Sequence, residues 1–193
     1  MGARAHSGWA VLVAVAESGG SIRVVDRRRI ELADPAVPGF PQPYHAAEPL
    51  SLTDAEKLLE RCLATSRRLA EQAFRAAVGE LESSGYEVAA CGVLARAGRP
   101  LPPLASILAS HALIHTAEGE MFRDALRHGV DQCGLAAAAL RERDAWDHAA
   151  GLLRFKAADL QRRIGELGRD LGPPWREDQK LATLGGWVAL RAP

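Results

Sequence analysis

Residues 9–32 read WAVLVAVAESGGSIRVVDRRRIEL, and this stretch predicts the sheet around which the chain folds. Residues 9–16 are apolar on both faces, as is typical of a strand in the interior of a sheet. Residues 17–21 supply the glycines that a tight hairpin turn needs. Residues 22–32 alternate in part, so we expect a second strand. Its arginine triplet, residues 27–29, is interpreted as a solvated strand end, with phosphate binding as the alternative.

Downstream of this hairpin, the apolar periodicity switches repeatedly between that of a helix and that of a strand. Residues 51–84 predict a long amphipathic helix, which Thr53 and Glu56 open as a capping box. Apolar strands are expected at residues 86–95 and 135–140. Further helices are predicted over residues 144–155 and 157–171 and from residue 175 onward. This alternation predicts an α/β fold.

Residues 103–129, PLASILASHALIHTAEGEMFRDALRHG, carry the one local anomaly that has chemical content. At 3.6 residues per turn, the apolar residues of this stretch form one stripe of a single helix. His111, His115 and Glu118 fall in the middle of that stripe, where leucines would be expected. We therefore expect these three side chains to be buried together or to line a cavity in the core.

Three interpretations of His111, His115 and Glu118 remain open. Two imidazoles one helical turn apart, with a carboxylate on the same face, could hold a divalent metal. This donor set suits zinc or ferrous iron better than magnesium. The same residues could instead form a catalytic or ligand-lining cluster, or a structural network in which Glu118 pairs with an arginine. An unpaired carboxylate in the core is strongly unfavourable, so Glu118 needs a partner in every case.

Cationic side chains next to two of the predicted helices are further candidates. Arg96 and Arg99 lie in the turn-rich segment before residue 103, where they could meet an anion or pair with Glu118. Lys180 lies near the start of the last helix together with Asp178, where the two could bind a phosphate or cap the helix. We take Arg96, Arg99 and Lys180 as candidate ligand-binding residues and Asp178 as a candidate catalytic acid.

Two histidines outside the predicted helices complete the candidate ligand-binding residues. Residues 1–8 are short and polar, which predicts a loop or a frayed end, and His6 would lie there at one end of the sheet. His45 lies toward the end of the proline-studded connection of residues 33–50, in which four X-Pro steps between residues 34 and 43 exclude helix and interior strand. A long connection of this kind inside a compact domain often has a function.

Composition places the chain among ordinary globular proteins. The 193 residues suit a single α/β domain over residues 1–193, with 48% hydrophobic and 25% charged residues. The formal net charge is zero, so nothing indicates a highly charged partner. The three cysteines are widely spaced and form no CxxC pair, which indicates free thiols in a reducing compartment. No segment approaches the length of a membrane span, and we expect a cytoplasmic protein.

Three stretches resemble the ribonuclease-H-like superfamily, in which strands and helices follow in the order predicted here. GARAHSGWAVL, residues 2–12, is similar to the turn and second strand that follow the first catalytic aspartate in the Holliday-junction-resolvase branch. YEVAACGVLA, residues 86–95, is similar to the next catalytic strand. REDQKLATLGGWVAL, residues 176–190, is similar to the terminal helix, which begins beside an acidic residue, here Glu177 or Asp178. The resemblance implies a small mixed sheet flanked by long helices.

The resemblance also implies a chemistry that this chain does not support. The family cleaves phosphodiesters with two metal ions, which several convergent carboxylates hold. On this alignment, the first strand and its aspartate have no counterpart. The second carboxylate position falls near Cys91 and Gly92, which do not bind magnesium, and the terminal acid alone remains. We therefore expect a ribonuclease-H-like fold that lacks the usual catalytic carboxylates.

Three functions fit these observations. The first is a non-nuclease protein that binds a small anionic ligand or a nucleic acid near His111, His115 and Glu118. The second is a metal-dependent nuclease or other hydrolase, which uses those residues for one metal or rebuilds a site from Asp178 and Glu118. The third is a non-enzymatic interaction protein whose contact surface is the proline-rich connection.

Overall fold

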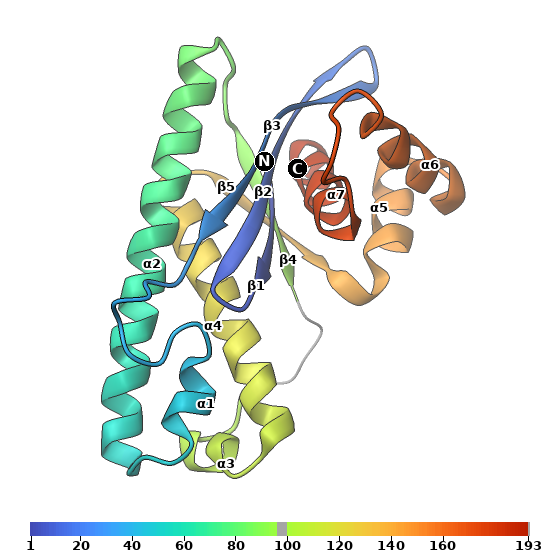
Figure 1. Ribbon diagram of the computed structural model, residues 1–193. Coiled ribbons are helices and arrows are strands. Elements are labelled where there is room, and N and C mark those ends of the chain that lie inside the picture. Colours follow the sequence, from blue (N-terminus) through green and yellow to red (C-terminus); the bar gives the residue numbers. More distant parts are fainter. Residues whose placement is uncertain (96–99, 193) are drawn as a thin grey trace.

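The computed structural model describes residues 1–95 and 100–192, and within these ranges it contains a five-stranded mixed sheet (Figure 1). The strands are β1 (Gly2–His6), β2 (Trp9–Ser18), β3 (Ser21–Glu31), β4 (Ala90–Ala95) and β5 (Ala136–Arg141). Their order across the sheet is β3-β2-β1-β4-β5. Strands β1 to β3 are antiparallel neighbours, whereas β4 lies parallel to both β1 and β5. The predicted α/β class and small mixed sheet are confirmed.

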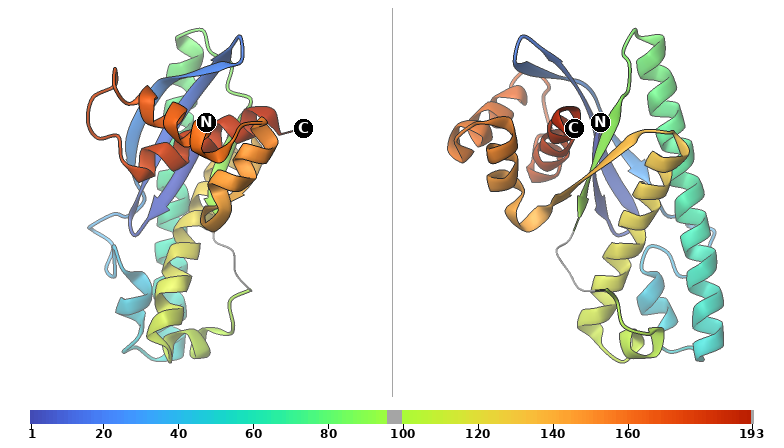
Figure 2. Two further views of the ribbon diagram at one scale, coloured as in Figure 1. Left: turned by 90° about the vertical axis from the view of Figure 1, so that its right-hand side faces the viewer. Right: turned by 180° about the vertical axis from the view of Figure 1, so that it is seen from behind.

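Helices cover both faces of the sheet (Figures 1 and 2). They are α1 (Pro43–Ala47), α2 (Leu52–Ser83), α3 (Leu104–Leu108), α4 (His111–Gln132), α5 (Ala145–Leu153), α6 (Ala157–Leu167) and α7 (Glu177–Arg191). Helices α2 and α4 pack on one face, and α7 packs on the other with α5 and α6 outside it. Helices α2 and α4 extend past the sheet, and α1 and α3 lie against this extension. No described helix is long and apolar enough to cross a membrane.

The first eight residues do not form the expected loop or frayed end, because residues 2–6 form the central strand β1. Met1 and Ala3 point into the core beneath α2 and α4, so even this short polar segment has one apolar face. On the opposite face, Gly2 leaves room for α7: a Cβ there would overlap the backbone of Ala182 and Gly186. Residues 2–6, for which no strand was expected, thus carry Arg4 and His6 on a central strand.

The helix expected over residues 103–129 is interrupted. It is divided into α3 and α4, because Ser110 has an extended backbone and stands at the N-cap of α4. The predicted inner face persists through Ile114, Met121 and Phe122, which are buried. At the start of the long helix α2, Ser51 accepts a hydrogen bond from the amide of Asp54, so Ser51 is the cap in place of Thr53.

Candidate functional site

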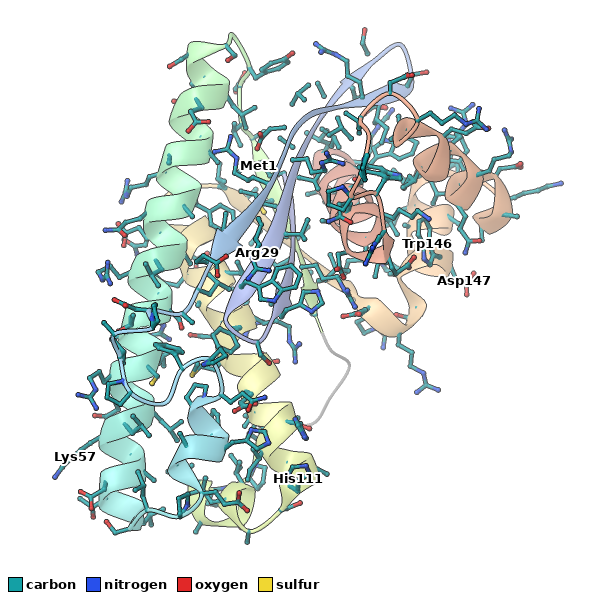
Figure 3. All side chains as sticks on the ribbon, viewed as in Figure 1. Met1, Arg29, Lys57, His111, Trp146 and Asp147 are labelled. Carbon is teal, nitrogen blue, oxygen red and sulfur yellow. The ribbon has the colours of Figure 1, made fainter. Side chains whose placement is uncertain are left out.

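Three histidines from distant parts of the chain meet beside the extension of α2 and α4. His45 comes from α1, and His111 and His115 come from the first two turns of α4 (Figure 3). One ring nitrogen from each residue lies within 4.8 Å of the other two. The Nε2 atoms of His111 and His115 are 3.1 Å apart. This is the one group of three or more His, Cys, Asp or Glu side chains with such convergence in residues 1–95 and 100–192.

Local structure explains how the three rings come together. The i, i+4 spacing places His111 and His115 on one face of α4, with ring centroids 4.5 Å apart. In α1, Pro43 occupies the first turn and Ala47 is buried, which seats this short helix against α2 and α4. The ring of His45 is thereby held 4.7 Å from the ring of His115.

Glu118 lies one turn further along α4 and supports the cluster from behind. Its side chain is only 2% exposed, and its Oε1 lies 2.9 Å from Nδ1 of His45. The backbone N–H of His45 donates to the same oxygen at 3.3 Å. An ionised carboxylate only accepts hydrogen bonds, so in the neutral ring of His45 the proton lies on Nδ1 and the lone pair on Nε2. Burial, and then the charge of Glu118, raises the pKa of the neighbouring Tyr44.

This geometry bears on two expectations about Glu118 and its neighbours. Among the described residues the partner of Glu118 is His45, and the arginines named as possible partners, Arg96 and Arg99, lie outside them. His111 and His115 are exposed rather than buried in the core, since α4 begins at His111 and its first turns lie at the surface. Of the predicted trio, Glu118 lies behind the cluster, and His45 provides the third converging nitrogen.

The arrangement suits a transition metal. Zinc binds imidazole nitrogen at about 2.0–2.1 Å in a tetrahedron, which separates two such nitrogens by roughly 3.3 Å. The separation between His111 and His115 is close to this value. A carboxylate that holds the far nitrogen of a ligating histidine is the usual second layer of such sites. Without a metal, two neutral imidazoles at this distance satisfy each other through one hydrogen bond.

A second polar cluster lies on the other side of the sheet, where β1 ends. The guanidinium of Arg4 contacts Asp178 at the start of α7 and Glu142 just after β5. Nε2 of His6 lies 2.9 Å from the same carboxylate of Asp178. Partial burial and the charge of Arg4 lower the pKa of His6. Arg4 and Glu142 were not anticipated, because residues 1–8 were expected to be a loop.

An arginine-lined cleft of about 390 Å³ adjoins this second cluster. Its walls include Trp9, Arg27, Arg29 and Arg176. The guanidinium of Arg29 stacks over the ring of Trp9 at 4.2 Å. Arg27 donates to backbone carbonyls of residues 171, 172 and 174, so its charge is not neutralised by these contacts. The cleft can therefore attract an anion.

The remaining predicted residues are scattered. Lys180 lies half-buried on α7, remote from the histidines. Asp178 and Glu118 belong to helices on opposite faces of the sheet, so they do not form a joint site. Arg96 and Arg99 lie outside the described residues. Comparison with protein-family models, curated proteins and solved structures found no match to this chain.

Proposed function

We propose that this chain binds one divalent transition metal through His45, His111 and His115, and that zinc fits the site best. The observation that carries the proposal is the convergence of three imidazole nitrogens within 4.8 Å. The buried Glu118 supports it by fixing the proton of His45 on Nδ1, which leaves Nε2 free to bind the metal.

The proposed role of the metal is to activate water in a hydrolytic reaction. Three protein ligands with an open fourth position are the pattern of catalytic rather than structural zinc sites. His111 and His115 are exposed, so the open position would face solvent. A zinc-bound water can ionise near neutral pH and attack an ester, amide or phosphate bond.

Elemental analysis of the purified protein after exposure to buffered zinc tests the metal site. We expect about one zinc per chain in the wild type and loss of that zinc in His45→Ala and His115→Ala. His128→Ala is the matched control, because His128 also lies on α4 but outside the cluster, and it should keep the metal. A wild-type chain that takes up no zinc, or equal loss in the control, contradicts the proposal.

We further propose that the fold is ribonuclease-H-like. Strand β1 supports this, because it fills the position that the alignment left empty. With α1, α3, α5 and α6 left aside, the order is β1, β2, β3, α2, β4, α4, β5, α7, and Asp178 lies at the start of the last helix, which is consistent with the resemblance. On this proposal, the chain has the family's architecture without its magnesium-dependent cleavage of nucleic acid.

The arginine-lined cleft favours a second candidate function, the binding of an anionic ligand or single-stranded nucleic acid. Arg176 is exposed at its rim, and Arg29 presents a guanidinium stacked on Trp9, as proteins that bind nucleic acid often do. Fluorescence anisotropy with a labelled oligonucleotide at low salt tests it. Arg176→Ala should weaken binding and reduce its salt dependence. Binding that is absent, or unaffected by Arg176→Ala, rules this function out.

A further inference from the structure

The resemblance to the ribonuclease-H-like superfamily implies divalent metals at the end of the sheet, and the residues there do not fit them. Magnesium needs several oxygen ligands, each about 2.0–2.1 Å from one point. The described residues offer the carboxylates of Glu142 and Asp178, while β1 contributes Arg4 and His6. These donors do not form a group of three within 4.8 Å, unlike the histidines on the opposite side of the sheet.

We infer that Arg4 takes the place of the metal, as a permanent internal cation that joins α7 and the segment after β5 to the central strand. Its side chain reaches both carboxylates: one terminal nitrogen contacts Asp178, while Nε and the other terminal nitrogen contact Glu142. A guanidinium stays charged at every physiological pH and presents donors on two sides. It can therefore bridge carboxylates that are too far apart to share one metal ion.

The surroundings make this charge necessary. The side chain of Arg4 is 18% exposed and that of Asp178 is 23% exposed, so solvent screens this pair incompletely, whereas Glu142 is 38% exposed. His6 donates a hydrogen bond to Asp178 but adds little positive charge, because its pKa is lowered. His6 also stacks on Trp9, with ring centroids 4.2 Å apart, which holds the ring in place. Arg4 is thus the cation that balances Asp178 and Glu142.

A double-mutant cycle tests this assignment through thermal unfolding. Arg4→Met removes the charge and keeps most of the side-chain length, and we expect it to lower Tm by roughly 5 °C or more. In an Asp178→Asn/Glu142→Gln background, Arg4→Met should lower Tm by less than half as much, because no carboxylates then need a cation. Arg141→Met is the matched control: Arg141 is also a strand arginine with a carboxylate partner, Asp144, but it is well exposed. It should change Tm little.

The wild-type protein provides the second arm of the test. Millimolar Mg²⁺, which does not suit a three-histidine site, should leave its Tm unchanged. An equal fall in Tm on Arg4→Met in both backgrounds would overturn the inference. It would also be overturned by a clear rise in Tm with Mg²⁺ that Asp178→Asn abolishes. The magnesium arm needs no variant of Arg4, so it decides the question even where Arg4→Met does not fold. Neither arm depends on zinc binding.

Discussion

At the scale of single residues, the pairing of Glu118 with His45 connects buried charge to the metal site. A carboxylate that is 2% exposed needs a donor, and the donor it receives belongs to a histidine that also contributes a ring nitrogen to the cluster. The hydrogen bond to Nδ1 of His45 makes that ring a better metal ligand, because it fixes the tautomer and increases the electron density on Nε2. The same contact therefore stabilises the fold and prepares the site.

Glu118→Gln separates these two effects. The amide oxygen can still accept the hydrogen bond from His45, so we expect a folded protein. The negative charge is lost, and zinc affinity should fall roughly 10- to 100-fold. Competition with a chromophoric chelator measures this. Glu120→Gln is a suitable control, since Glu120 lies on the same helix and pairs with Arg123 and Arg127 instead. An affinity equal to that of the wild type would show that Glu118 has no role in the site.

His6 gives a prediction of pH dependence. Its pKa is lowered in the folded protein, first by burial and then by the charge of Arg4. The unfolded chain therefore takes up the proton first as the pH falls below the ordinary histidine value of about 6.5. Folding stability should decrease in that range, and His6→Gln should lose less stability between pH 7 and pH 5 than the wild type. Denaturant unfolding at both pH values measures this, and identical losses would contradict it.

At the scale of elements, the close contact of α7 with the sheet depends on glycine. Gly2 and Gly92 are neighbours on β1 and β4, and a Cβ on Gly92 would overlap the backbone of Gly185 in α7. This absence of side chains brings Asp178, at the start of α7, toward the end of β1.

Gly92→Ala tests this packing. The added methyl group must push α7 away from the sheet, which should destabilise the fold by about 1–3 kcal/mol. The control is Gly79→Ala in α2, where a Cβ would meet no atom within 4 Å. That change should be neutral or stabilising by about 0.5–1 kcal/mol, because alanine favours helix. Thermal unfolding compares the two, and equal effects would show that α7 does not pack as described.

Elements with a clear hydrophobic period were predictable from the sequence, and those that depend on tertiary contacts were not. The hairpin of β2 and β3 and helix α2 follow from local pattern. Strand β5 was expected from its place in the element order, because its run of alanines favours a helix. Strand β1 is too short and polar to show a period, and its pairing with β2 and β4 creates it. The break before α4 depends on the extended backbone of Ser110. The apolar periodicity continues through this position, so the sequence predicts one uninterrupted helix.

The site was predictable to a similar extent. The i, i+4 spacing revealed His111 and His115, because both lie on one helix. His45 was recognised as a chemical group, but its distance of 66 positions from His111 gave no sign that the two would meet. Arg4 could be found only after β1 was known to be a strand.

At the scale of the whole molecule, the two polar clusters are separated by the sheet. The three histidines come from α1 and the start of α4, where His111 is labelled in Figure 3. Arg4 contacts Asp178 of α7, which covers the other face of the sheet (Figure 1). The sheet thus separates Arg4, which balances the charges of Asp178 and Glu142, from the proposed metal site. The proposed metal site lies at the surface, because His111 and His115 are exposed.

X-ray absorption at the zinc edge of the stoichiometrically loaded protein tests the central claim most directly. We predict nitrogen or oxygen neighbours at about 2.0–2.1 Å, with the outer-shell scattering of three imidazole rings. The three cysteines offer the competing chemistry. Sulfur neighbours at about 2.3 Å, or a spectrum unchanged by His45→Ala, would contradict the three-histidine site.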